Sequence, residues 1–214
     1  MKIPDRKILK TLYWIHAAIR KDVVRLETIV IKLDLYNANG MRYAQHWFQH
    51  HVKAMHHHHH LEKDFLTFEL DKHLSDSKTK MDLLERQYND CTKCMHIIDD
   101  SFKLLTMDND DAAEKEKLKQ SILKYGDAIA SLLKQKELLI EKIVANVKEE
   151  EILNLDQKFI ETMPLEIKVH TLPWIFDAMA ENDKNDLMNR LPFKTKLMYN
   201  FRLKSKYNKL VSSL

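Results

Sequence analysis

Four long stretches of the chain place apolar residues three and four positions apart, and this spacing constrains the fold more than any other feature. Residues at positions i, i+3, i+4 and i+7 lie on one face of a helix, so each stretch predicts a long amphipathic helix. The predicted helices cover about residues 6–35, 41–74 and 81–105, and a fourth runs from about residue 112 past residue 153. A regular alternation of three and four is typical of left-handed helical bundles.

The composition leaves little material for any other class of fold. The chain has 214 residues with only two glycines and four prolines, whereas a sheet of regularly spaced strands requires many more turns. Charged residues make up 31% of the chain and apolar residues 44%, which suits amphipathic helices rather than a disordered chain. We therefore predict an all-α protein, built as an antiparallel up-down-up-down four-helix bundle with a short helical C-terminal appendage.

Short polar residues and prolines mark the predicted boundaries. Asp5 is the expected N-cap of the first helix, and the acidic run Asp108–Asp111 suits the N-terminus of the fourth. Three prolines after residue 160 divide the remaining chain into short pieces. We predict that residues 1–157 form the bundle and that residues 158–214 form the appendage, with Trp174 and Phe176 packing it against the bundle.

A run of histidines at residues 56–60 lies inside the second predicted helix. Five consecutive histidines resemble a purification tag, but a tag sits at a terminus and interrupts the surrounding pattern, whereas this run continues it. His58 and Glu62 fall on the apolar face, one turn apart, where an imidazole and a carboxylate can reach the same metal ion. Buried polar groups need partners, and a metal is one way to supply them.

Each of the other three predicted helices also carries a polar residue on its apolar face. These residues are His16 on the first helix, Tyr88 on the third, and Asn146 and Glu150 on the fourth. Bundles hold metals by directing such donors inward from several helices. A single histidine such as His16 is more often a core residue that is hydrogen-bonded to a neighbour. The predicted metal site therefore requires all four helices to place their donors at one height.

Three segments together resemble the hemerythrin-like proteins of bacteria, also called HHE cation-binding domains. The segments are IHAAIRKDVVRLE (Ile15–Glu27), the histidine-rich stretch ending in HHHLE, and LPWIFDAMAENDKNDLMNRLP (Leu172–Pro192). They occur in the expected order, and the resemblance covers nearly the whole chain. It implies a four-helix bundle that holds a non-haem, oxo-bridged di-iron centre. It also implies oxygen binding, reduction of dioxygen or peroxide, or sensing of iron or oxygen.

The resemblance also implies a ligand set, from which this chain departs at two positions. His16 matches the histidine of the family's first helix, and His58 and Glu62 match the His-x-x-x-Glu motif of the second. Tyr88 and Asn146 stand where the family has histidines, and Glu150 matches the glutamate of the second motif. A phenolate such as that of Tyr88 binds ferric iron well, whereas the Asn146 amide is a weak ligand for iron. The predicted metal ligands are His16, His58, Glu62, Tyr88, Asn146 and Glu150.

Two classes of function follow from this partly altered ligand set. In the first, the protein holds non-haem iron and acts on a small molecule such as dioxygen or peroxide, as an enzyme or as a sensor. In the second, the bundle has lost the metal and serves as a binding or structural protein. Metal content separates the two classes.

The sequence predicts no membrane span, no secretory signal and no functional cysteine site. The chain has no run of 18 uncharged apolar residues and no apolar signal region near its N-terminus. Cys91 and Cys94 do not form the disulfide framework of a small secreted protein. A zinc site would need a second pair of soft ligands, and a thioredoxin-like site would need a preceding strand. We expect a cytoplasmic protein in which both cysteines are small core residues.

The remaining histidines and the basic C-terminal stretch have simpler expected roles. His51 is predicted to be a buried, hydrogen-bonded histidine, whereas the His46–His50 pair lies on a flank of its helix. Residues 193–214 contain six lysines or arginines and no acidic residue, with aromatic residues interleaved. This composition fits an acidic partner, a membrane surface or nucleic acid. We expect instead a terminal helix that covers the bundle, and no nucleic-acid binding.

Overall fold

The computed structural model describes residues 9–35, 38–73, 76–106 and 111–212. Nearly all of these residues lie in helices, and no strand occurs among them, so the prediction of an all-α protein is confirmed. The predicted N-cap Asp5 and the start of the first predicted helix lie outside the described residues.

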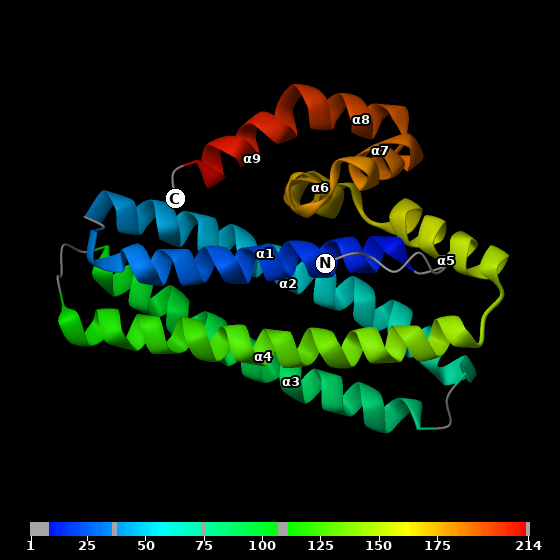
Figure 1. Cartoon of the computed structure of the whole chain (residues 1–214), viewed down its shortest axis with the longest axis horizontal. Coiled ribbons are helices and arrows are strands. Elements are labelled where there is room, and N and C mark those ends of the chain that lie inside the picture. The colour runs from blue at the N-terminus through cyan, green and yellow to red at the C-terminus, as the bar shows by residue number, and fades with distance from the viewer. Residues whose placement is uncertain (1–8, 36–37, 74–75, 107–110, 213–214) are drawn as a thin grey trace.

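Four long helices run along the longest dimension of the molecule (Figure 1). They are α1 (Lys10–Lys32, followed by a 3₁₀ turn at Leu33–Leu35), α2 (Ala38–His73), α3 (Ser77–Leu105) and α4 (Ala112–Ala145). They lie side by side, with α1 above α4 and with α2 and α3 running from upper left to lower right in the view of Figure 1. Asp111 caps α4 as predicted, because its carboxylate accepts hydrogen bonds from the backbone N–H groups of Ala113 (2.8 Å) and Glu114 (3.3 Å).

The four long helices enclose a core with large aromatic side chains. Trp14, Trp47 and Tyr125 are fully buried and come from three different helices. Gly126 allows α4 to approach α1 closely, because a Cβ atom at this position would lie 3.3 Å from the side chain of Val23. The apolar faces predicted from the three-four spacing therefore face one another in this core.

The fourth helix is shorter than predicted. The sequence pattern predicts a helix continuing past residue 153, but α4 ends at Ala145 and α5 begins at Glu149. Asn146 ends α4, with its side-chain amide donating to the carbonyl of Lys142 (2.8 Å). Lys148 is extended, and the three glutamates of Glu149–Glu151 then occupy the first turn of α5, where negative charge stabilises a helix N-terminus. These local preferences outweigh the apolar spacing that continues across the break.

The rest of the chain forms shorter helices along one side of the four long ones (Figure 1). They are α5 (Glu149–Thr162), α6 (Leu165–Ala178), α7 (Glu181–Arg190), α8 (Phe193–Met198), a π-helical turn (Tyr199–Leu203) and α9 (Lys204–Val211). The predicted domain boundary at residue 157 falls inside α5, and the division into bundle and appendage stays a prediction. Within the described residues, no helix has both the length and the apolar character that crossing a bilayer requires.

The C-terminal helices are joined to the long helices by a buried polar network centred on Asp22. The Asp22 carboxylate lies 2.8 Å from His51 Nδ1 and accepts hydrogen bonds from Trp174 Nε1 (2.7 Å) and Arg25 (2.8 Å). His51 Nε2 lies 2.7 Å from the hydroxyl of Tyr125. His51 is thus the buried, hydrogen-bonded histidine predicted from the sequence, and Trp174 is buried as predicted.

Candidate metal centre

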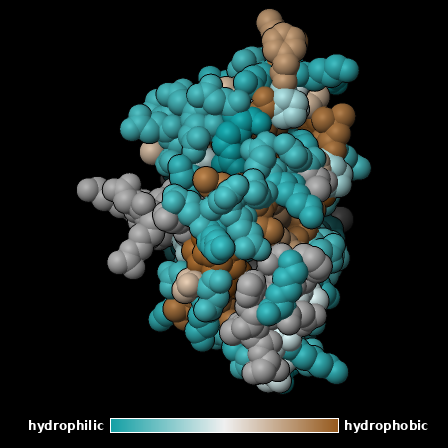
Figure 2. Space-filling view, turned by 90° about the vertical axis from the view of Figure 1, so that its right-hand side faces the viewer, coloured by the Kyte–Doolittle hydropathy of each residue, from teal (hydrophilic) through white to brown (hydrophobic). Residues whose placement is uncertain are grey.

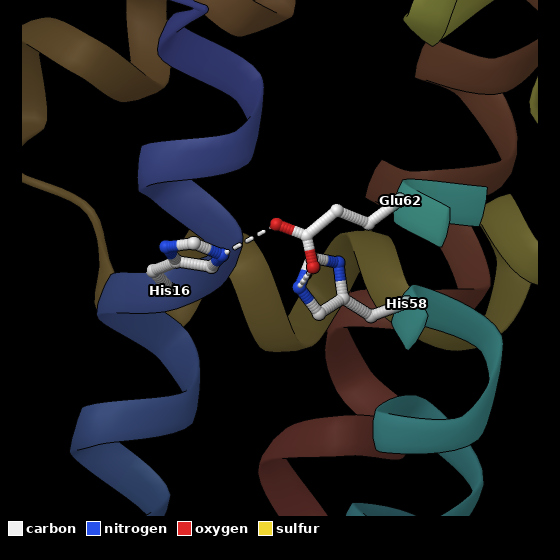
Figure 3. A group of neighbouring side chains, drawn as sticks. All are labelled: His16, His58 and Glu62. Carbon is white, nitrogen blue, oxygen red and sulfur yellow. Dashed lines mark hydrogen bonds and ion pairs between the residues drawn. The ribbon is translucent and has the colours of Figure 1, made fainter. Parts of the chain in front are cut away.

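His16, His58 and Glu62 come together between α1 and α2, and all three side chains are buried (Figure 3). One ligand atom from each residue lies within 4.8 Å of the other two. His58 and Glu62 stand one turn apart on α2, and His16 faces them from α1 (Figure 3). The helical spacing thus explains the first pair, and the packing of α1 against α2 brings in the third residue.

Glu62 is the centre of this group. Its Oε1 atom lies 3.2 Å from His16 Nε2, and its Oε2 atom lies 3.1 Å from His58 Nε2. Lys136, from α4, also donates to Oε2. Burial by itself would raise the pKa of Glu62, but the positive charge of Lys136, the neighbouring His58 and the hydrogen bond from His16 hold this pKa well below its ordinary value. Glu62 is therefore an anionic donor in the interior of the protein.

His16 lies between two carboxylates. Its Nε2 atom faces Glu62, and its Nδ1 atom lies 3.0 Å from Oε1 of Glu137, which Arg20 holds with a 2.8 Å hydrogen bond. Burial opposes protonation of His16, yet the hydrogen bonds to Glu137 and Glu62 raise its pKa above the ordinary value. A carboxylate on the second ring nitrogen is the usual arrangement for a metal-binding histidine, because it orients the ring. Glu137 can perform this role while Nε2 serves as the ligand atom.

His58 is the least satisfied side chain of the group. Its Nδ1 atom forms no hydrogen bond with any residue that the structure describes, whereas its Nε2 atom lies 3.1 Å from Glu62 Oε2 (Figure 3). Burial lowers the pKa of His58 to about 4, so the imidazole is neutral at physiological pH. A buried polar atom without a partner costs free energy, and a neutral imidazole is the form that binds metals. A metal ion at this position would satisfy His58.

The structure does not bring the other three predicted ligands into this group. Tyr88 stacks on the ring of His59, with centroids 3.4 Å apart, and its hydroxyl lies 2.6 Å from His56 Nδ1. Burial raises the pKa of Tyr88, which keeps it a neutral phenol. Asn146 and Glu150 are exposed on either side of the break between α4 and α5. Their predicted inward positions are wrong because the helix that would carry them both ends at Ala145.

Two residues of the site, Lys136 and Glu137, were not predicted from the sequence. The apolar residues of α4 include Leu132 and Leu139 on the inward face, seven positions apart, and Lys136 lies between them at the three-four spacing. A lysine at such a position is a recognisable signal for a buried charge. Glu137 gives no comparable signal, since its role depends on its contacts with α1.

The other sequence features lie outside this group. Cys91 and Cys94 are free and buried, as predicted, and burial raises the pKa of Cys91 to about 12, so its thiol is unreactive. His46 is exposed, whereas His50 stacks on His170 of α6, with ring centroids 4.0 Å apart. His50 thus contributes to the contact between α2 and α6 rather than to a pair with His46.

The donor set fits one metal ion better than two. Two imidazoles and one carboxylate form the ligand set of mononuclear non-haem iron sites, which leave further coordination positions open. A di-iron bundle uses carboxylates and histidines from all four helices. Among the described histidine, cysteine and acidic side chains, only His16, His58 and Glu62 form a group with metal-binding spacing.

Comparison with known proteins identifies no relative. No protein-family model, curated protein or solved structure matches the chain. The resemblance to hemerythrin-like proteins therefore depends on residues of this sequence alone.

Proposed function

We propose that this chain is a hemerythrin-like protein that holds one non-haem iron ion through His16, His58 and Glu62. In this proposal α1–α4 are the up-down-up-down four-helix bundle, and the helices after α4 are its appendage. The observation that carries the proposal is the buried His58, whose Nδ1 atom has no hydrogen-bond partner among the described residues and whose Nε2 atom faces the anionic carboxylate of Glu62. The two histidines and the carboxylate are the chemistry that iron prefers in such sites.

Bound iron would bind or reduce dioxygen or peroxide, or would allow the protein to sense iron or oxygen. The surrounding residues of this chain have separate tasks. Glu137 and Arg20 orient His16 so that its Nε2 atom faces Glu62. The core on both sides of the site excludes water, because the neighbouring Leu12 and Ile19 of α1 and Met55 of α2 are buried. Metal binding must displace the proton that His16 Nε2 donates to Glu62, so uptake is expected to weaken at low pH.

Metal analysis of the full chain tests this proposal. The protein is purified without metal-affinity resin, because exposed histidines of α2 such as His46 and His60 would take up metal from the resin. We expect about one iron per chain, because two histidines and one carboxylate form a single mononuclear site. His58→Ala should abolish it. His60→Ala is the matched control, since His60 belongs to the same run but is exposed, and it should retain the iron. A metal content equal in both variants would overturn the proposal.

One observation favours a second candidate function. The ammonium group of Lys136 donates a hydrogen bond to Glu62 Oε2, an oxygen that a metal ion would need as a ligand. A buried ion pair of this kind can replace a metal as the counter-charge of a buried carboxylate. In this second candidate the protein is a metal-free bundle that acts as a binding or structural protein. A chain free of iron, whose melting temperature does not change when iron or a chelator is added, would support this candidate.

A further inference from the structure

The C-terminal segment formed by α8, the π-helical turn and α9 buries one face against the rest of the protein. Its buried residues are four positions apart, at Thr195, Tyr199, Leu203 and Tyr207. Tyr199 packs against Phe176 of α6, with ring centroids 4.4 Å apart, and Tyr207 contacts His50 of α2. The spacing of four, rather than an alternation of three and four, accompanies the π-helical turn at Tyr199–Leu203. This face packs the segment onto the rest of the protein, as predicted.

The opposite face of the same segment carries a row of apolar side chains that are exposed. Phe193, Leu197 and Phe201 are 72%, 41% and 83% exposed, and each lies two positions after or before a buried residue. We call these three residues the C-terminal apolar row. Single exposed apolar residues are ordinary, but three on one face of one helical segment, two of them phenylalanines, mark an interaction surface. Figure 2 shows apolar side chains projecting at the top of the molecule, in the region of α7 and α8.

Positive charge surrounds this row. The segment from residue 193 to residue 212 has six basic residues and no acidic one, and five of the basic residues are exposed. These five are Lys194, Arg202, Lys204, Lys206 and Lys209. None of them forms an ion pair with another residue that the structure describes. Their charges are therefore available to an external anionic surface.

We propose that the C-terminal apolar row docks on an anionic membrane surface. A helix lying in the plane of a membrane buries its apolar face at the boundary between headgroups and acyl chains, while flanking lysines and arginines contact anionic lipids. The segment that carries the row lies on the outer edge of the molecule, on the side away from α3 and α4 (Figure 1), and the three side chains are exposed. This association is peripheral, and it goes beyond the proposed metal function and does not depend on it.

The arrangement of the row favours a membrane over a nucleic-acid duplex, whose bases are stacked inside. Binding to phosphates would need the cations alone, and exposed phenylalanines between them would gain nothing from a phosphate backbone. A bilayer instead takes up both kinds of side chain at once.

Co-sedimentation with lipid vesicles tests the proposal on the full chain. We expect binding to phosphatidylcholine vesicles that contain about 30% phosphatidylserine, and little binding to phosphatidylcholine alone. Raising the salt concentration from about 0.1 M to about 0.5 M should weaken the binding at least about tenfold, because salt screens the attraction between exposed charges. Equal binding to both kinds of vesicle, or no binding to either, would overturn the proposal.

Paired variants separate the contribution of the row from that of the charges. The double variant Phe193→Ser/Phe201→Ser should lower vesicle affinity at least about tenfold, because the apolar contact is lost. Its matched control is Leu123→Ser/Leu138→Ser, which removes two half-exposed leucines of α4 on the other side of the molecule. The control should bind as the unmodified chain does, and a circular dichroism spectrum confirms that both variants are folded. An unchanged affinity in the phenylalanine variant would contradict the proposal.

The basic residues are tested in the same way. Lys204→Glu/Lys206→Glu should lower the affinity for anionic vesicles, whereas Lys124→Glu/Lys134→Glu changes two exposed lysines of α4 and should leave it unaltered. Duplex DNA serves as the competing ligand. If the chain binds DNA more tightly than anionic vesicles, and only the lysine variant reduces that binding, the segment is a nucleic-acid site and the proposal is wrong.

A fluorescence reporter detects insertion directly. Trp14, Trp47 and Trp174 are at most 1% exposed, so a tryptophan introduced by Phe201→Trp is the one that senses added vesicles. Its emission should shift to shorter wavelength with anionic vesicles, since the indole leaves water. An emission that does not shift, in a sample that co-sediments, would show that the row stays outside the bilayer and would overturn the proposal.

Discussion

At the scale of single residues, the interior of this protein contains buried charges that would destabilise the fold if they had no partner of opposite charge. Glu62 and Lys136 are both buried and pair directly, and His16 and His58 surround the same carboxylate. Breaking a buried ion pair by removing one partner costs much more than replacing both partners, because the remaining charge has no counter-charge. We therefore expect the pair to affect the stability of the fold and, in the proposed metal site, the access of a metal to Glu62.

Substitutions in this pair give a direct prediction. In the presence of chelator, Glu62→Gln or Lys136→Met alone should lower the free energy of unfolding by about 3–5 kcal/mol, and the double variant should lose much less than the sum. Denaturant unfolding of all four proteins measures the coupling. Additive losses would show that the pair is not formed in solution. If iron binds as proposed, Lys136→Met should also bind it more tightly, since the competing charge is gone.

The histidines at the contact between α2 and α6 predict the response of stability to pH. Burial, followed by the neighbouring charge of His170, lowers the pKa of His50 to about 3. A histidine whose folded pKa lies below its unfolded value of about 6.5 binds a proton more readily when unfolded, so its contribution destabilises the fold as the pH falls below about 6.5. When the pH falls from about 7 to about 5, the free energy of unfolding should decrease by about 1–2 kcal/mol less in His50→Gln than in the unmodified chain. Equal losses, measured by denaturant unfolding, would contradict this assignment.

At the scale of helices, the ends of α4 decide which residues can reach the site. Asp111 begins the helix with a side-chain cap, and Asn146 ends it before Glu150. α4 therefore provides Lys136 and Glu137 to the site, whereas Glu150 lies beyond its C-terminal end.

The cap of α4 can be tested by itself. Asp111→Ala should lower the free energy of unfolding by about 1 kcal/mol, because two backbone N–H groups lose their acceptor. Asp111→Ser should restore most of this stability, since serine is also a good N-cap residue. Denaturant unfolding of the three proteins provides the comparison, and an alanine variant as stable as the serine variant would show that the cap has no effect.

At the scale of the whole molecule, Asp22 holds the C-terminal helices on the four long ones. It contacts His51 of α2, Trp174 of α6 and Arg25, and Arg25 in turn binds Asp177 of α6. A buried carboxylate with this many partners stabilises the assembly only while all of its partners remain in place.

Removal of the Asp22 carboxylate should therefore destabilise the packing of α6 more than that of α3. Asp22→Ala should lower the free energy of unfolding by about 3–5 kcal/mol, and hydrogen exchange of α6 amides should accelerate more than that of α3 amides. Asp186→Ala is a control that removes a half-exposed carboxylate pairing with Lys10, and it should change stability by less than about 1 kcal/mol. Uniform acceleration of exchange in α3 and α6 would show that Asp22 does not join the two parts.

The amino-acid pattern alone is enough to predict that the chain is helical and that several key residues face inward. The three-four spacing predicts the inward positions of His16, His58 and Glu62, because side-chain direction follows from position along a helix. The same spacing wrongly predicts inward positions for Asn146 and Glu150, since an apolar pattern does not show where a capping residue interrupts a helix.

Which of the inward residues meet depends on how the helices pack. Spacing along one helix defines a face but not the height of that helix relative to its neighbours. The position of His16 opposite Glu62, and of Lys136 on the same carboxylate, depends on how α1, α2 and α4 pack. Buried charges then select their partners through contacts between residues far apart in the chain, because such groups are stable in the interior only when they are paired.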